Sequence, residues 1–154
     1  MSFRDFEKRI RKRADLITKN ATKGVRAVAI AVDNQVVFST PVDTGRARAN
    51  WIASINRPSN VINREPLAGP ASAGPAVAEA LQVIKSFGEN DDAIFISNSV
   101  SYINELNNGS SAQAPRNFVQ KGIIRGIRVA KKIKLLDLRN NANPAGVSDP
   151  GILR

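Results

Sequence analysis

The chain has 154 residues, enough for one domain with a buried core, and 42% of them are hydrophobic. It contains neither cysteine nor histidine. This composition excludes disulfides, thiol nucleophiles, Cys/His zinc sites and every catalytic triad that needs imidazole. The formal net charge is +10, with the basic residues concentrated in 1–26 and 116–139. Such a charge is typical of proteins that bind nucleic acid, an acidic protein or an acidic membrane surface.

Residues 3 to about 38 have the periodicity of one long amphipathic helix. Its apolar stripe recurs at spacings of three, four or seven: Phe3, Phe6, Ile10, Ile17, Ala21, Val25, Val28 and Val32. Gly24 lies inside this pattern and costs about 1 kcal/mol relative to alanine, so a bend there is an open alternative. Pro41 ends the helix, because the residue before a proline avoids the helical region.

The middle of the chain predicts two strands separated by a loop and a helix. Residues 51–55 alternate large and small side chains and predict a strand, and residues 93–100 predict a second strand that pairs with it. Residues 56–75 hold four prolines and predict a loop long enough to contact something. Residues 76–87 predict a short helix that ends at Gly88.

The last third predicts a single turn over 102–106 and a second long helix from near Pro115 to about Leu136. The apolar stripe of that helix is Val119, Ile123, Ile127, Ala130, Ile133 and Leu136. Gly122 and Gly126 are spaced as in closely packed helices. Residues 140–154 predict an extended C-terminal tail.

The predicted fold is therefore α+β, with two long amphipathic helices packed on a small antiparallel sheet. A Pro-rich loop and the extended tail complete it. We expect one domain over 1–139 and the tail over 140–154. No apolar run approaches the roughly 20 residues that span a bilayer, and residues 1–13 lack the apolar segment of a signal peptide. We therefore expect no membrane contact and synthesis in the cytoplasm.

Asp43-Thr44-Gly45 is the triplet that carries the catalytic aspartate of aspartic proteases. That chemistry needs two aspartates about 3 Å apart that share one proton. The chain has one such triplet, so it would have to dimerise. Arg46 and Arg48 would keep nearby carboxylates ionised, which opposes a shared proton. We therefore disfavour a protease and expect no catalytic residue.

A structural turn explains the same triplet better. Pro41 fixes φ, the side chain of Asp43 or Thr44 accepts backbone N–H groups, and Gly45 permits positive φ. The turn would reverse the chain between the long helix and the Trp51 strand. Arg46 and Arg48 would then share one side of an extended segment and hold acids of a neighbouring element or subunit.

The basic helices suggest a second function class. Their lysines and arginines would meet DNA phosphates, but a solvated helix face is the explanation that we favour. The sequence has no helix-turn-helix pair and no RNA-recognition aromatic pattern, so the alternative is non-specific DNA binding. Glu79 and Glu105 have no partner at metal-ligand spacing. We expect no metal and no cofactor.

Two blocks of the sequence, TPVDTGRARANW and, further along, ISNSVSYINELNNGSSAQAP followed by an amphipathic helix, resemble the small tail-component proteins of tailed bacteriophages. These are head–tail joining, neck or tail-completion proteins. The first block is matched by Pro41, Val42, Asp43, Thr44, Gly45 and Arg46, and the second by Asn98, Tyr102, Glu105, Gly109 and Pro115. The order and spacing of both blocks carry the resemblance, which covers about residues 3–135.

The resemblance implies a non-enzymatic virion protein that assembles as a homo-oligomeric ring, expected to be a hexamer. Its partners would be copies of itself, a portal-adaptor connector, and a tail-terminator or tail-tube protein, with DNA passing through the channel without sequence-specific binding. We expect Asp43, Thr44, Gly45 and Arg46 to shape the turn. The residues expected at or near subunit contacts are Arg46, Arg48, Trp51, Tyr102 and Glu105.

Overall fold

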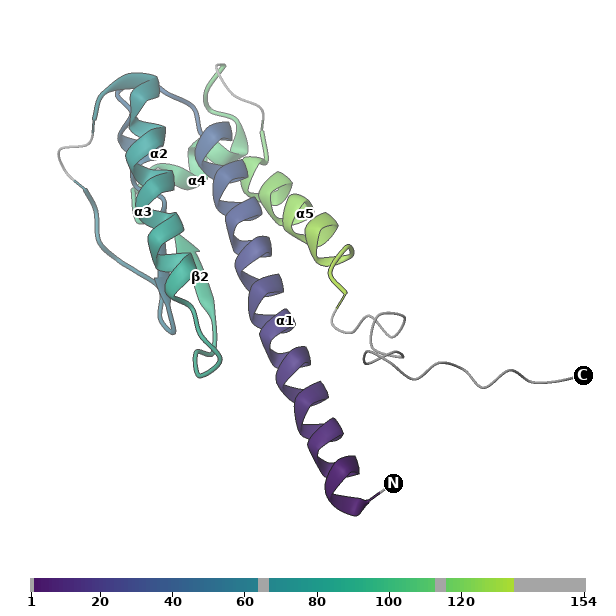
Figure 1. Cartoon of the computed structure of the whole chain (residues 1–154). Helices are drawn as coiled ribbons and strands as arrows, with labels where there is room; N and C mark the ends of the chain where they lie inside the picture. The colour runs from purple at the N-terminus through teal and green to yellow at the C-terminus, as the bar shows by residue number, and fades with distance from the viewer. Residues whose placement is uncertain (1, 64–66, 113–115, 135–154) are drawn as a thin grey trace, which may run out of the picture.

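The computed structural model describes residues 2–63, 67–112 and 116–134. A single long helix, α1 (Phe3–Ser39), extends along the molecule, and the other described elements gather around its C-terminal half (Figure 1). These elements are, in order, α2 (Arg46–Ala49), β1 (Ile52–Ile55), the 3-10 helix η1 (Gly69–Ser72), α3 (Ala73–Ser86), β2 (Ile94–Ser97), α4 (Ile103–Asn108) and α5 (Phe118–Ala130). The architecture is α+β, with long helices and a two-stranded antiparallel sheet, as predicted.

Helix α1 begins and ends on clear sequence signals. The Ser2 hydroxyl accepts a hydrogen bond from the backbone N–H of Arg4, and the Asp5 carboxylate accepts one from the N–H of Ser2, which forms a capping box. The helix runs without a break through Gly24, so the bend considered there does not occur. It ends at Ser39 because Pro41 holds Thr40 in an extended conformation.

The sheet packs with α1 and α3 around two buried hydrophobic clusters. In the antiparallel pair, Ala53 lies opposite Ile96 and Ile55 opposite Ile94, so these four side chains share one face. One buried cluster contains Ala29, Ala53, Ala80 and Ile84, and a second contains Val36, Val37, Trp51, Ala73, Ala76 and Phe118. The rings of Trp51 and Phe118 meet edge to face with centroids 6.3 Å apart.

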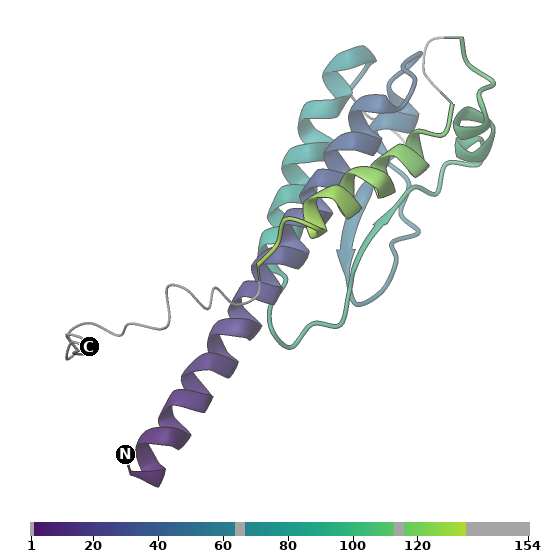
Figure 2. The same cartoon turned by 90° about the vertical axis from the view of Figure 1, so that its right-hand side faces the viewer.

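Helix α5 packs against α1 through its glycines (Figure 2). A Cβ atom on Gly122 would lie 2.6 Å from Val36 Cγ1, and one on Gly126 would lie 2.6 Å from Val32 Cγ2. The close packing expected from this glycine pair is confirmed. The predicted stripe was wrong for Ile123 and Ile127, whose side chains are about half exposed, because the glycine face brings the two helix backbones closest together.

Several predicted boundaries shift in the structure. Helix α5 ends at Ala130, short of the predicted 136, and Lys131 and Lys132 form a turn. The loop predicted over 56–75 contains η1 and the first residues of α3. The single turn predicted after Tyr102 is the six-residue helix α4. Pro115, Leu136 and the tail expected over 140–154 lie outside the described residues.

Candidate functional site

The segment from Thr40 to Trp51 redirects the chain from α1 into β1, with the Asp-Thr-Gly triplet at its turn. Gly45 has φ +87°, a backbone conformation that favours glycine. A Cβ atom at this position would also lie 2.8 Å from the carbonyl oxygen of Leu67, so a side chain has no room there. The Thr44 hydroxyl accepts a hydrogen bond from Arg46 N at 3.4 Å, and Thr44 O accepts one from Gly69 N at 3.3 Å. Asp43 lies exposed beside this turn. The triplet therefore docks the end of the Pro-rich loop.

The two arginines that follow the turn have different environments. They belong to the helical turn α2, so the prediction that they share one side of an extended segment was wrong. Residues two apart in a helix point to roughly opposite sides. Arg46 is exposed, whereas Nη2 of Arg48 donates to Thr40 O at 2.8 Å and Phe38 O at 3.3 Å. Burial lowers the pKa of Arg48. The Arg48 side chain provides hydrogen-bond donors for backbone carbonyls at the C-terminal end of α1.

Trp51 is a core residue of this chain, with 6% of its surface exposed. Its indole Nε1 donates to the hydroxyl of Thr40 at 2.7 Å, and the same hydroxyl donates to Val36 O at 2.6 Å. One buried threonine thus satisfies the indole N–H and a carbonyl in the last turn of α1. Trp51 positions the turn from inside the fold and presents little surface to a neighbour.

Two asparagines that the sequence analysis did not assign as site residues connect the segment to the rest of the fold. Asn50 is fully buried: its Nδ2 donates to Arg46 O at 2.7 Å and Asn63 O at 3.1 Å, and its Oδ1 accepts from Asn63 N at 2.6 Å. Asn98 Nδ2 donates to Ala47 O at 2.8 Å. This last bond joins the two sequence blocks in space. No periodicity marks these asparagines. Both lie within the two sequence blocks, and each is a polar residue close to an apolar strand.

Tyr102 and Glu105 lie at the start of α4, one helical turn apart, and both are exposed. Together with Asp43, Thr44 and Arg46, they are the expected site residues that reach the surface. Arg48 and Trp51 make the internal contacts described above.

The N-terminal half of α1, residues Phe3–Lys19, is called the arm below. It projects beyond the other described elements in both views (Figures 1 and 2). Every residue from Phe3 to Asp15 is exposed, including large apolar side chains. The exposed fractions are 81% for Phe3, 52% for Phe6, 49% for Ile10 and 38% for Ile17. The sequence predicted this stripe, but not that it would be uncovered.

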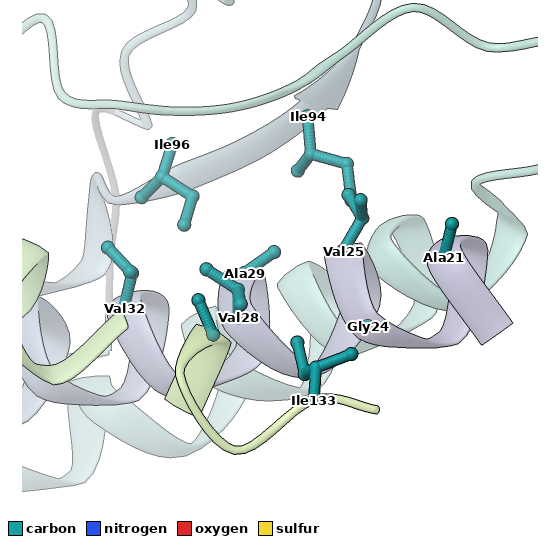
Figure 3. A pocket seen from close by; sticks show the side chains of 10 residues that line it. Ala21, Gly24, Val25, Val28, Ala29, Val32, Ile94, Ile96 and Ile133 are labelled. Carbon is teal, nitrogen blue, oxygen red and sulfur yellow. The ribbon is translucent and has the colours of Figure 1, made fainter. Parts of the chain in front are cut away.

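An apolar groove of about 650 Å³ continues the stripe of the arm. One wall is α1, the other is β2, and the chain after α5 closes one side (Figure 3). Ile94 and Ile96 point from β2 toward the valines of α1. The lining residues are Ala21, Gly24, Val25, Val28, Ala29, Val32, Ile94, Ile96, Ala130 and Ile133.

Asp33 is the one acid that the structure buries in α1, with 2% of its surface exposed. It lies one turn after Ala29 and one turn before Val37, between the two core clusters. Its Oδ1 has no hydrogen-bond partner among the described residues, and burial raises its pKa to about 7. This carboxyl lies inside the fold, away from the arm.

In the described part of the chain, no three His, Cys, Asp or Glu side chains gather as metal ligands would. None of the described helices has the length and apolar content needed to cross a membrane. The features that stand out are the exposed apolar stripe of the arm, the groove, and the isoleucines of α5.

No protein-family model, curated protein or solved structure matches this chain. A relationship to phage tail components is therefore still a prediction, based on the two sequence blocks.

Proposed function

We propose that this protein is a structural virion component of a tailed phage, which joins head and tail as a ring-forming neck or tail-completion subunit. The observation that carries the proposal is the arm, a helix exposed on all sides whose stripe contains four large hydrophobic residues. Soluble monomers rarely expose contiguous apolar surface of this kind, whereas assembly interfaces require it. The subunit would be made in the host cytoplasm and end in the virion.

Ring assembly needs two different complementary patches on each subunit, because ring contacts are heterologous. The described surface offers several unlike patches. The arm is basic and apolar, the groove is apolar, and the outer face of α5 exposes Ile123, Ile124 and Ile127. The exposed pair Tyr102 and Glu105 adds a polar patch on α4. These surfaces support a subunit with several neighbours: its own copies, a portal-adaptor connector above and a tail-terminator or tail-tube protein below.

The second candidate function is non-specific DNA binding, which the charge of the arm favours. Residues 3–19 hold seven lysines and arginines against three acids, on an exposed helix. A DNA-binding arm would lose duplex affinity steeply as salt rises, because each phosphate contact releases counterions. A binding titration at several salt concentrations tests this. If duplex affinity is weak at physiological salt and does not depend steeply on salt concentration, DNA binding by the arm is rejected and the assembly role is retained.

Deletion of the gene in its phage, with lysates examined by negative-stain electron microscopy, tests the proposed function. We expect filled heads and separate tails, and restoration of joined virions when the parent gene is supplied in trans. Complementation by an Asp43→Asn variant would also restore them, because Asp43 is an exposed turn residue in this account. Normal virions from the deletion would overturn the proposal.

A further inference from the structure

We propose that the arm of one subunit lies in the apolar groove of a second copy, so that identical subunits join head to tail. The inference rests on the proposed function as a ring protein and names the contact that would build the ring. Its occupant is the exposed stripe of the arm, and its receptor is the groove between α1 and β2. Each subunit would use both surfaces, one toward each neighbour.

The dimensions of the two surfaces match. The groove follows α1 from Ala21 to Val32, about 16 Å at 1.5 Å per helical residue. The exposed stripe runs from Phe3 to Ile17, about 21 Å on the same measure. Its first three apolar residues have the spacing by which an amphipathic helix inserts anchors into a hydrophobic groove. The aromatic and branched anchors would meet the valine and isoleucine walls seen in Figure 3.

The arm cannot fill the groove of its own chain. The same unbroken helix forms both the arm and one wall of the groove. Phe6 lies about 22 Å along the helix axis from Ala21, the nearest lining residue. A straight helix cannot fold back on itself without breaking hydrogen bonds of its backbone. An arm in a groove is therefore a contact between two copies.

Charge favours the Ile94 end of the groove over a second arm as the surface that the arm meets. The arm is basic, so two arms side by side would repel each other. The turn that leads into β2 is acidic, and Glu89 and Asp92 in it are exposed. Arg26 Nε donates to Phe87 O at 2.8 Å, which holds this turn beside α1 at the Ile94 end of the groove. The basic sides of an incoming arm would meet these acids.

The contact is heterologous, since the arm and the groove are different surfaces. Repetition of a heterologous contact produces a closed ring when the rotation between subunits closes, and an open filament when it does not. A symmetric arm-to-arm contact would instead stop at a dimer. The composition of cross-linked products distinguishes these cases.

Cysteine cross-linking tests the contact directly, because the parent chain has no cysteine. Phe6→Cys and Ile94→Cys would be purified separately, mixed at high protein concentration and oxidised. We expect a covalent dimer that contains one chain of each variant. A chain with both substitutions should give a ladder of higher oligomers. The matched control is Ser101→Cys, an exposed position before α4, which should give no product with Phe6→Cys.

Two further variants sharpen the test. Replacing Glu89 and Asp92 by lysine should lower the yield of the mixed cross-link several-fold, and replacing Lys8 and Lys12 by glutamate in the arm variant should restore part of it. If Ile94→Cys unfolds the chain, Val25→Cys presents an exposed thiol on the opposite wall of the groove.

Each other result would overturn the inference. Dimers of Phe6→Cys with itself in preference to the mixed product would show an arm-to-arm contact. A mixed product that forms only after removal of 135–154 would show that the chain's own C-terminal segment occupies the groove. Rings seen by electron microscopy without the cross-link would reject this contact while leaving the proposed function intact. A protein that stays monomeric, without cross-links at any concentration, would reject the contact as well.

Discussion

The two halves of α1 have the same apolar spacing but different environments. In the C-terminal half, Ala29, Val36 and Val37 are buried by α3, α5 and the sheet. In the arm, Phe3, Phe6 and Ile10 are exposed to solvent. Hydrophobic periodicity thus identified a helix and its apolar face, but not what covers that face. We infer that the C-terminal half stabilises the subunit and that the arm serves contacts between subunits.

Replacing phenylalanine by alanine in the body and in the arm tests this comparison with the largest expected effect. Phe118 is fully buried against Trp51, so Phe118→Ala should lower the free energy of unfolding by about 3–5 kcal/mol. Phe6→Ala, the matched change in the arm, should alter it by no more than about 0.5 kcal/mol. Urea unfolding of both variants measures the difference. Equal losses would mean that the arm is packed in the isolated subunit.

The pH dependence of stability should be governed in part by Asp33. Its folded pKa of about 7 lies above its ordinary value of 3.8, so the folded chain holds a proton that the unfolded chain releases. The free energy of unfolding should therefore fall as the pH rises from about 4 to about 7, by about 1.4 kcal/mol for each pH unit at most. Above pH 7 this contribution to the slope ends.

Asp33→Asn should remove this part of the pH dependence and raise stability at pH 8, because the amide needs no proton to stay neutral. Unfolding measured at pH 5 and pH 8 checks it, with Asp15→Asn as the control for loss of one acid from the same helix. An unchanged difference between the two pH values in Asp33→Asn would contradict the assignment.

Thr18 within α1 and Thr40 at its C-cap make the same local hydrogen bond in different surroundings. Thr40 Oγ1 donates to Val36 O and accepts from the buried indole of Trp51, whereas Thr18 Oγ1 donates to Ala14 O on the exposed arm. Thr40→Val leaves a buried N–H without a partner and should cost about 1–3 kcal/mol. Thr18→Val should change stability by less than about 0.5 kcal/mol. Thermal unfolding of the pair measures both, and similar shifts in Tm would count against the comparison.

Local sequence signals predicted α1, the pairing of the two strands and the turn at Asp43-Thr44-Gly45. Caps, proline and glycine positions, and apolar alternation act over a few residues, so the sequence displays them directly. The face of α5 could not be predicted in this way. The periodicity of apolar side chains places the large hydrophobic residues on the buried face of a helix. In α5, Gly122 and Gly126 face Val36 and Val32 because they lack side chains.

The polar contacts of the candidate site also escaped prediction. Asn50 and Thr40 are buried because partners distant in the sequence satisfy their hydrogen bonds. The hydrogen bonds of Arg48 to the end of α1 were likewise not predicted. Such burial depends on tertiary geometry, which no single stretch of sequence specifies. The exposure of the arm could not be predicted for the same reason, because it depends on which parts of α1 the rest of the chain covers.

The central claim is that the arm contributes to assembly and not to the fold of the subunit. The most direct test combines Phe3→Ser, Phe6→Ser and Ile10→Ser, and measures both the unfolding of the isolated protein and the joining of heads to tails in complemented phage. We predict a free energy of unfolding within about 1 kcal/mol of the parent, together with separate heads and tails. Joined virions at the parent yield, or a subunit that no longer folds, would contradict the claim.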